Sequence, residues 1–315
     1  MSALTVTEDA AAVTVHYGST PLLRYVHRPG DPVRESPRPY GHPIRTLAGG
    51  VVTIYRPHDH VWHKGLALSL PNVGEANFWG GVTWVRGQGY VQQPNNGSMR
   101  HDAFDAVAVE NEAAVLRERL TWVTEPGEAW FTERRTLSVS VHPALDAWVL
   151  LFDTRFTNVT DATIPIGSPT TRGRPNAGYG GLMWRGPRSF TGGMVRIPGV
   201  TGGDELMGVR APWLAFTGVH DGHLRASTLV MVDWPANSGD GRLTRGTADD
   251  DGPRWFVRST PFAAVCPAPF FDTELPVGPG DTVHLRYAVV VADGDGSRAE
   301  EWAKLGRSVL ERWTP

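Results

Sequence analysis

The chain of 315 residues is poor in cysteine, in lysine and in long apolar runs. Its single cysteine, Cys266, cannot form an internal disulfide. No stretch approaches the roughly 20 apolar residues of a membrane-spanning helix. The net charge is only −3 and no basic run occurs, which argues against nucleic acid as a partner. The first residues lack the basic and apolar segments of a signal peptide, so we expect a soluble, cytoplasmic protein without a membrane partner.

Glycine and proline are plentiful and spread along the whole length, 36 and 25 residues respectively, as in proteins with many short strands. Strict apolar–polar alternation over residues 129–141 predicts a long half-buried strand. The neighbouring segments 115–124 and 148–156 alternate in the same way and predict an antiparallel meander. Further strands are expected at residues 212–219, 226–233, 254–259 and 282–291.

The end of the chain predicts a helix over about residues 297–313, with Ser297 as its cap and an apolar stripe from Trp302 to Leu310. No repeat or linker divides the sequence. We therefore predict an all-β protein, a large antiparallel β-sandwich forming a single domain over residues 1–315, with a short C-terminal helix.

The most unusual segment is residues 56–65, where His58, His60, His63 and Asp59 fall within six positions. Apolar runs at residues 51–55 and 66–70 flank it and predict strands, so the segment is expected to be a loop at the rim of a sheet. Histidine is the side chain best suited to proton transfer near neutral pH, which favours a functional site. The alternative is a solvated polar loop in which Asp59 caps a turn.

In an extended loop His60 and His63 would point to opposite faces, so they converge only if the chain turns between them. A pair of histidines falls short of the three or four ligands of a usual metal site. His42 and His101 are candidates to complete such a set. We predict no metal site and no cofactor, and leave a divalent metal open.

Two other segments carry chemistry-bearing side chains. Glu133 shares the apolar face of its strand with Arg135, so it is either paired there or lines a cavity. The glycine-rich stretch 177–185 contains Tyr179, Trp184 and Arg185, a stacking surface beside a fixed cation.

These segments, in this order, resemble the bacterial family called methane oxygenase PmoA-like. The family's loop usually reads Asp-His-Pro-His-His-Arg-Gly, where this chain has Val61, Trp62 and Lys64 in place of the Pro, the middle His and the Arg. The resemblance implies a fold similar to the galactose mutarotase supersandwich and a link to bacterial sugar catabolism. It covers most of the chain, through residues 40–43, 59–65, 77–80, 179–182 and 279–294.

The sequence favours an enzyme acting on a sugar, an oxidised (keto) sugar or a glycoside by acid–base chemistry, as a hydrolase, lyase or epimerase. The alternative is a non-catalytic carbohydrate-binding or regulatory module of sugar catabolism. A monooxygenase would need a redox metal, for which the ligand set is thin. The expected catalytic residues are His60, His63, Asp59 and Glu133; the expected substrate-binding residues are His42, Lys64, Trp79, His101, Tyr179, Trp184 and Arg185. If a loop histidine is the base and Glu133 the acid, the rate should follow a bell-shaped pH profile.

Overall fold

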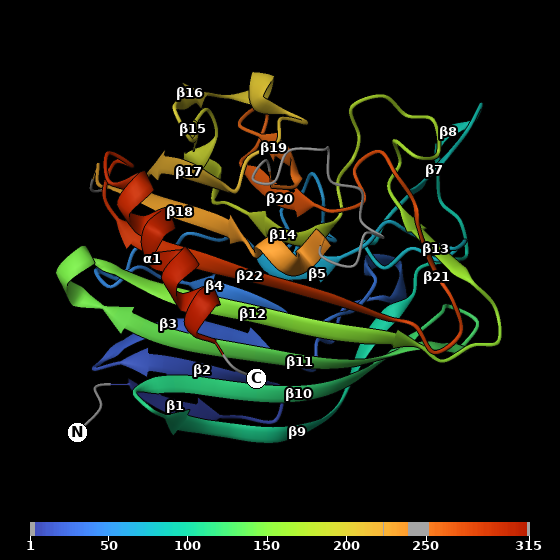
Figure 1. The fold of residues 1–315 in the computed structure, drawn as a ribbon, viewed down its shortest axis with the longest axis horizontal. Helices are drawn as coiled ribbons and strands as arrows, with labels where there is room; N and C mark the ends of the chain where they lie inside the picture. Colours follow the sequence, from blue (N-terminus) through green and yellow to red (C-terminus); the bar gives the residue numbers. More distant parts are fainter. Residues whose placement is uncertain (1–3, 223, 239–251, 314–315) are drawn as a thin grey trace.

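The structure is a computed structural model that describes residues 4–222, 224–238 and 252–313. Two large antiparallel sheets face each other and a helix covers the outside of one of them (Figure 1). The predicted all-β class, a large antiparallel sandwich with a C-terminal helix, is confirmed. None of the helices in these three ranges is long and apolar enough to span a membrane.

The first sheet has eight strands in the order β1-β2-β3-β4-β5-β14-β20-β19. Its two halves come from distant parts of the chain, since β5 pairs with β14, more than a hundred residues later. The strands are β1 (Leu4–Glu8), β2 (Ala12–Tyr17), β3 (Thr20–Val26), β4 (Tyr40–Ile44), β5 (Leu66–Ser69), β14 (Gly181–Arg185), β20 (Ala264–Ala268) and β19 (Arg254–Arg258).

The second sheet has nine strands in the order β16-β15-β17-β18-β22-β12-β11-β10-β9. Its long central strands form the predicted meander, with β10 and β12 both antiparallel to β11. The strands are β9 (Ser98–Glu110), β10 (Ala113–Val123), β11 (Ala129–His142), β12 (Ala147–Asn158), β15 (Met194–Ile197), β16 (Val200–Gly202), β17 (Trp213–Val219), β18 (Ala226–Asp233) and β22 (Thr282–Asp293).

Shorter elements gather at one end of the sandwich, on the right in Figure 1. They comprise a three-stranded sheet of β6 (Asn72–Val73), β13 (Ile164–Gly167) and β21 (Leu275–Val277), and a hairpin of β7 (Thr83–Val85) and β8 (Gly89–Val91). Short 3₁₀ turns lie at η1 (Val33–Glu35), η2 (Pro143–Leu145), η3 (Arg188–Phe190), η4 (Asp204–Leu206) and η5 (Pro235–Ser238).

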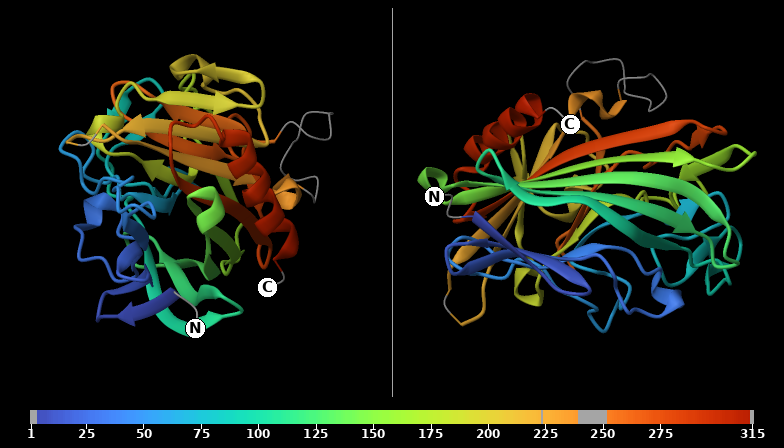
Figure 2. Two further views of the ribbon diagram at one scale, coloured as in Figure 1. Left: turned by 90° about the vertical axis from the view of Figure 1, so that its left-hand side faces the viewer. Right: turned by 90° about the horizontal axis from the view of Figure 1, so that it is seen from below.

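Apolar side chains from both sheets meet in one core, which follows from the alternation along each strand. The view from below in Figure 2 shows β9 to β12 lying over β1 to β3. Side chains of all these strands belong to the core. The core includes Leu68 and Trp184 of the first sheet and Leu137, Leu150 and Val289 of the second.

The helix α1 (Ala299–Arg312) packs its apolar stripe on the outer face of the nine-stranded sheet, against residues such as Val149 and Val290. It begins two residues later than predicted. Ser297 is not its cap, because Arg298 occupies the N-cap position and its side chain makes no capping hydrogen bond.

The expected strand at residues 51–55 is wrong. Only its ends make isolated bridges, Val51 with Arg45 and Tyr55 with Lys64. The apolar side chain of Val52 is fully buried although its backbone is irregular. The segment is buried or half-buried and makes only scattered backbone hydrogen bonds, to Ile44 and Arg185, which explains why its apolar run was mistaken for a strand.

Glu133 lies between the two sheets, on the inward face of β11, with 2% of its surface exposed. Its carboxylate accepts hydrogen bonds from Arg135 at 2.7 and 3.0 Å, from Trp122 at 2.6 Å and from Thr154 at 2.6 Å. Arg135 also donates to the hydroxyl of Tyr25 across the core. Glu133 therefore points inward, as predicted, and forms an ion pair with Arg135 in which both carboxylate oxygens accept hydrogen bonds.

Replacing Glu133 by Gln should lower the free energy of unfolding by about 3 kcal/mol or more, because Arg135 would remain buried without its counter-charge. Urea denaturation followed by tryptophan fluorescence measures this. Glu300→Gln, on an exposed position of α1, is the matched control and should change stability by less than about 0.5 kcal/mol. A loss in Glu133→Gln no larger than in the control would contradict this role.

Candidate functional site

The histidine segment lies between β4 and β5 and folds into two consecutive turns. The amide of His60 donates to the carbonyl of Pro57 at 3.0 Å, and that of His63 donates to the carbonyl of His60 at 2.9 Å. Gly65 ends the segment with φ of +70°, and a Cβ there would collide with the carbonyl oxygen of Gly41. The turns bring the rings of His60 and His63 into a parallel stack, with centroids 4.6 Å apart and planes 12° from parallel.

A single guanidinium connects the two histidines from behind. Arg185, at the end of β14, donates to Nδ1 of His63 at 2.8 Å and to Oδ2 of Asp59 at 2.8 Å. The same carboxylate oxygen lies 2.9 Å from Nδ1 of His60. The hydrogen-bonded chain His60–Asp59–Arg185–His63 therefore holds both rings in fixed orientations.

Burial and charge set the protonation states in this chain. Burial by itself raises the pKa of the Asp59 carboxyl, but hydrogen bonds from Arg185 and His60 outweigh it and hold the pKa well below its usual range. Burial lowers the pKa of His63 well below its ordinary value, and the nearby His60 and Arg185 lower it further. Asp59 is thus ionised and His63 neutral over the physiological range.

The two histidines line a cavity of about 360 Å³ on the outer face of the eight-stranded sheet. Met183 of β14, Phe256 of β19 and Ala264 of β20 form its floor, because their side chains point away from the main core. Loop residues form its walls. The lining residues are His60, Trp62, His63, Trp79, Gly80, Val82, Tyr90, Arg174, Tyr179, Met183, Phe256, Arg258, Phe262 and Ala264.

Aromatic rings make up most of the wall. Phe262 contacts His60 with ring centroids 5.1 Å apart, and Trp79 contacts His63 at 5.5 Å. Tyr179 lies 4.7 Å from Trp79. The cavity is thus a chamber lined mainly by aromatic rings, with the imidazole rings of His60 and His63 at one end.

Six of the predicted site residues come together here. His60, His63, Trp79 and Tyr179 line the cavity, while Asp59 and Arg185 lie directly behind the histidines.

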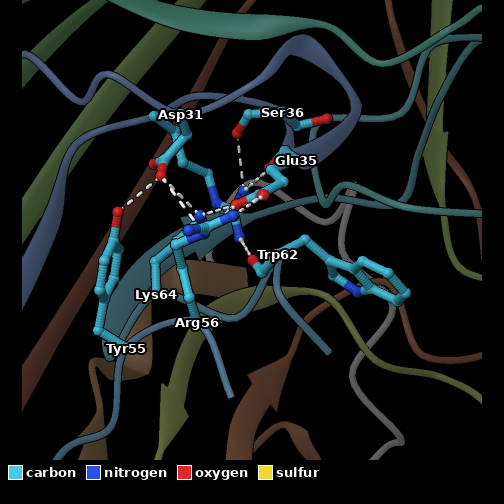
Figure 3. A network of polar contacts seen from close by, with 8 residues as sticks. Asp31, Glu35, Ser36, Tyr55, Arg56, Trp62 and Lys64 are labelled. Atoms are coloured by element: carbon cyan, nitrogen blue, oxygen red, sulfur yellow. Dashed lines mark hydrogen bonds and ion pairs between the residues drawn. The ribbon is translucent and has the colours of Figure 1, made fainter. Parts of the chain in front are cut away.

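Lys64 lies elsewhere, in a buried ionic network behind the loop (Figure 3). Its ammonium is 2.9 Å from Asp31 and also donates to Glu35, and its side chain is fully buried. Arg56 donates to both oxygens of Glu35, at 2.9 and 2.7 Å. Figure 3 shows the indole of Trp62 directed away from this network. Lys64 therefore fixes the loop to the segment that precedes β4 instead of facing the cavity.

Trp184 and His42 are also outside the cavity. Trp184 is fully buried in the core between the sheets and donates to the carbonyl of Val52 at 2.8 Å. Adjacent residues of a strand point to opposite faces, so Trp184 cannot share a surface with Arg185. His42 bonds Thr53 at 2.9 Å, and burial lowers its pKa to about 4.

Glu133 and His101 belong to a different region. Glu133 sits in the core between the sheets, as described above. His101 lines a second cavity of about 460 Å³, beside His27 and bonded to Glu118 at 2.6 Å. His101 lies on β9, the edge strand of the nine-stranded sheet, whereas β14 and the cavity belong to the eight-stranded sheet, a difference that the sequence pattern did not reveal.

Several lining residues were not predicted from the sequence. Alternation along β19 could have grouped Phe256 with Arg258, since both point to the outer face. Tyr90, Arg174 and Phe262 come from loops or a short hairpin, where no periodic signal exists. Only the fold brings them to the cavity.

The residues that the structure describes contain no group of three or more His, Cys, Asp or Glu side chains arranged to hold a metal ion.

Lys64→Gln should lower the free energy of unfolding by about 3–5 kcal/mol, because Asp31 and Glu35 would lose their buried counter-charge. Lys304→Gln is a matched control, since Lys304 is the only other lysine and lies exposed on α1. It should shift the urea midpoint very little. Equal stability of the two variants would exclude the anchoring role of Lys64.

Several solved structures share a partial likeness with the chain. The α-galactosidase AgaA of Geobacillus stearothermophilus, solved with raffinose, has 10% identity and a TM-score of 0.40, covering 99% of this chain and 45% of that one. The α-galactosidase of Lactobacillus brevis has 9% identity and a TM-score of 0.41, with 95% and 40% covered. The chain thus spans less than half the length of these enzymes, and a likeness at this level says nothing about a shared activity.

No curated protein matches the chain in sequence. A family model does: it is described as a family of unknown function, DUF6807, and it matches residues 12–305. This match does not test the more specific PmoA-like assignment. The chain belongs to the DUF6807 family.

Proposed function

We propose that the cavity is the active site of an enzyme that moves a proton on a carbohydrate substrate, with His60 as general base and His63 as hydrogen-bond donor. The observation that carries this proposal is the opposite bonding of the two stacked rings. Nδ1 of His60 faces a carboxylate, whereas Nδ1 of His63 faces a guanidinium.

These partners set the tautomers. A carboxylate only accepts, so Nδ1 of His60 carries the hydrogen and Nε2 is left with a free lone pair. A guanidinium only donates, so Nδ1 of His63 is bare and Nε2 of this neutral ring carries the hydrogen. One ring is thus ready to take a proton while its neighbour is ready to donate a hydrogen bond.

This pairing suits abstraction of a proton from carbon next to a carbonyl group. His60 Nε2 takes the proton, the C–H electron pair moves into the new carbon–carbon double bond, and the carbonyl oxygen gains the negative charge. His63 Nε2–H stabilises that oxygen by a hydrogen bond. Return of the proton to the other face gives an epimer, and loss of a leaving group from the next carbon gives an elimination product.

Two features favour a sugar or keto-sugar as the substrate. A volume of about 360 Å³ suits one monosaccharide, and the rings of Trp79, Tyr179 and Phe262 offer flat surfaces for the apolar faces of a pyranose. Glycoside hydrolysis usually needs two carboxyl groups beside the bond that breaks. Because the described residues that line this cavity include neither Asp nor Glu, an epimerase or lyase fits better than a hydrolase.

The aromatic lining also supports the alternative of a non-catalytic carbohydrate-binding module. Such a module would bind sugar without turnover. Binding would then depend on Trp79 and Tyr179 and be little affected by substitution of His60.

His60→Gln and His63→Gln should each lower kcat about 100-fold or more with an accepted keto-sugar, because each removes one partner of the proton transfer. His58→Gln is the control, since His58 is in the same loop but does not line the cavity. Exchange of substrate hydrogen with deuterium oxide, followed by NMR, measures the proton transfer directly. Wild-type exchange in both cavity variants would refute the mechanism.

The pH profile should lack the alkaline limb of the bell expected with Glu133 as the acid, because Glu133 does not line the cavity. The pKa of Asp59 is held low and that of His63 is lowered, so neither changes charge as the pH rises from neutrality. Burial raises the pKa of Tyr179 well above 10, so this hydroxyl also keeps its proton. The rate should therefore stay level from neutrality up to about pH 9 when it is measured against pH.

Asp59→Asn provides the companion measurement. An amide facing His60 can donate to Nδ1 and favour the tautomer whose Nε2 already holds a hydrogen, so kcat should fall about 10³-fold or more at every pH. Retention of the wild-type rate would show that Asp59 does not orient the base.

A further inference from the structure

Among the residues that the structure describes, the charged side chains that line the cavity are cationic. Arg174 and Arg258 contribute guanidinium groups, and none of the described lining residues is a carboxylate. Asp59, behind the histidines, is already bonded to Arg185. The described residues of the wall therefore present positive charge that no carboxylate among them balances.

Ring contacts place these arginines away from the histidines. His60, His63 and Phe262 contact one another at one end of the chamber. Trp79 connects His63 to Tyr179, and Tyr179 in turn contacts Phe256 at 5.4 Å.

At that second end Arg174 donates to the hydroxyl of Tyr90, which bonds Tyr179 at 2.9 Å. The guanidinium carbon of Arg258 is 5.7 Å from the ring of Phe256. The chamber thus has an acid–base end and a cationic end, joined by Trp79.

Both guanidinium groups have N–H groups left that can donate hydrogen bonds to a ligand. Arg174 uses one nitrogen for Tyr90 and stacks over that ring at 4.7 Å. Among the described residues, Arg258 forms an ion pair with Asp204 at 3.9 Å. Asp204 itself accepts backbone hydrogen bonds from Ser259 at 2.5 Å and from Thr260 at 3.3 Å, so it neutralises Arg258 only in part.

We propose that the substrate is an anionic monosaccharide, whose carboxylate or phosphate group is bound by Arg174 and Arg258 while its reacting carbon faces His60 and His63. The planar fork of an arginine matches both kinds of anion. This inference names the substrate class of the proposed active site and rests on that proposal. An ionised group at one end also fixes which carbon of the sugar lies at the histidines.

Binding of glucuronate, glucose phosphate and glucose, measured by isothermal titration calorimetry, tests this inference. At least one of the two anionic sugars should bind about tenfold or more tightly than glucose. The anion that does so distinguishes a carboxylate from a phosphate ligand. The preference should shrink several-fold in Arg174→Gln and in Arg258→Gln, and Arg258→Lys should retain part of it because the charge remains.

Arg134→Gln, at an exposed position on β11, is the control and should keep the full preference. Equal binding of all three sugars, no binding of either anion, or a preference that survives in the Arg174/Arg258 double variant would each overturn the inference.

The same titrations with His60→Gln separate this inference from the catalytic proposal. A charge preference that persists in that variant supports the anion site whether or not the wild type shows turnover. Turnover that depends on His60 without any charge preference would leave the acid–base proposal standing and exclude the anionic substrate.

Discussion

The candidate site depends on the guanidinium of Arg185. Only 2% of this residue is exposed, so its charge must be compensated within the protein. Asp59 supplies the counter-charge, and the ring of Phe262 lies 3.9 Å from the guanidinium carbon. Through one buried cation the loop is fixed to the sheet, Asp59 stays ionised and His63 stays neutral.

A second buried cation secures the other side of the same loop. Lys64 pairs with Asp31 and Glu35, and burial lowers its pKa while these carboxylates oppose that effect. The two cations hold the loop at both ends of the turn that carries His60 and His63. Rotamers fixed in this way are available for reaction without reordering, which is the usual advantage of a rigid scaffold under a loop site.

The outward face of the eight-stranded sheet, and not the space between the sheets, offers room for a ligand of this size beside the histidines. Between the sheets the apolar side chains interdigitate, and the charged pair of Glu133 and Arg135 is satisfied by protein donors and acceptors. On the outer face, short strands carry small residues such as Ala264 and Cys266, and the loops rise around them. The loops that rise above this face therefore enclose the chamber, with Met183, Phe256 and Ala264 as its floor.

Alternation and turn residues in the sequence were enough to predict the all-β class, the central meander and the inward position of Glu133, because these depend on neighbours one or two residues apart. The clustering of Asp59, His60 and His63 was also local and could be read directly. The irregular but buried run at residues 51–55 was mistaken for a strand, since apolar content reports burial and not hydrogen bonding.

Only the tertiary structure decided which distant residues meet. The pairing of β5 with β14 brings Arg185 to Asp59 and His63, and the packing of loops brings Arg174 and Tyr90 to the cavity. The same packing takes Lys64 and Trp184 away from it, into an ion network and a core. Long-range contacts of this kind depend on the register and twist of whole sheets, for which the order of residues along the chain gives no local signal.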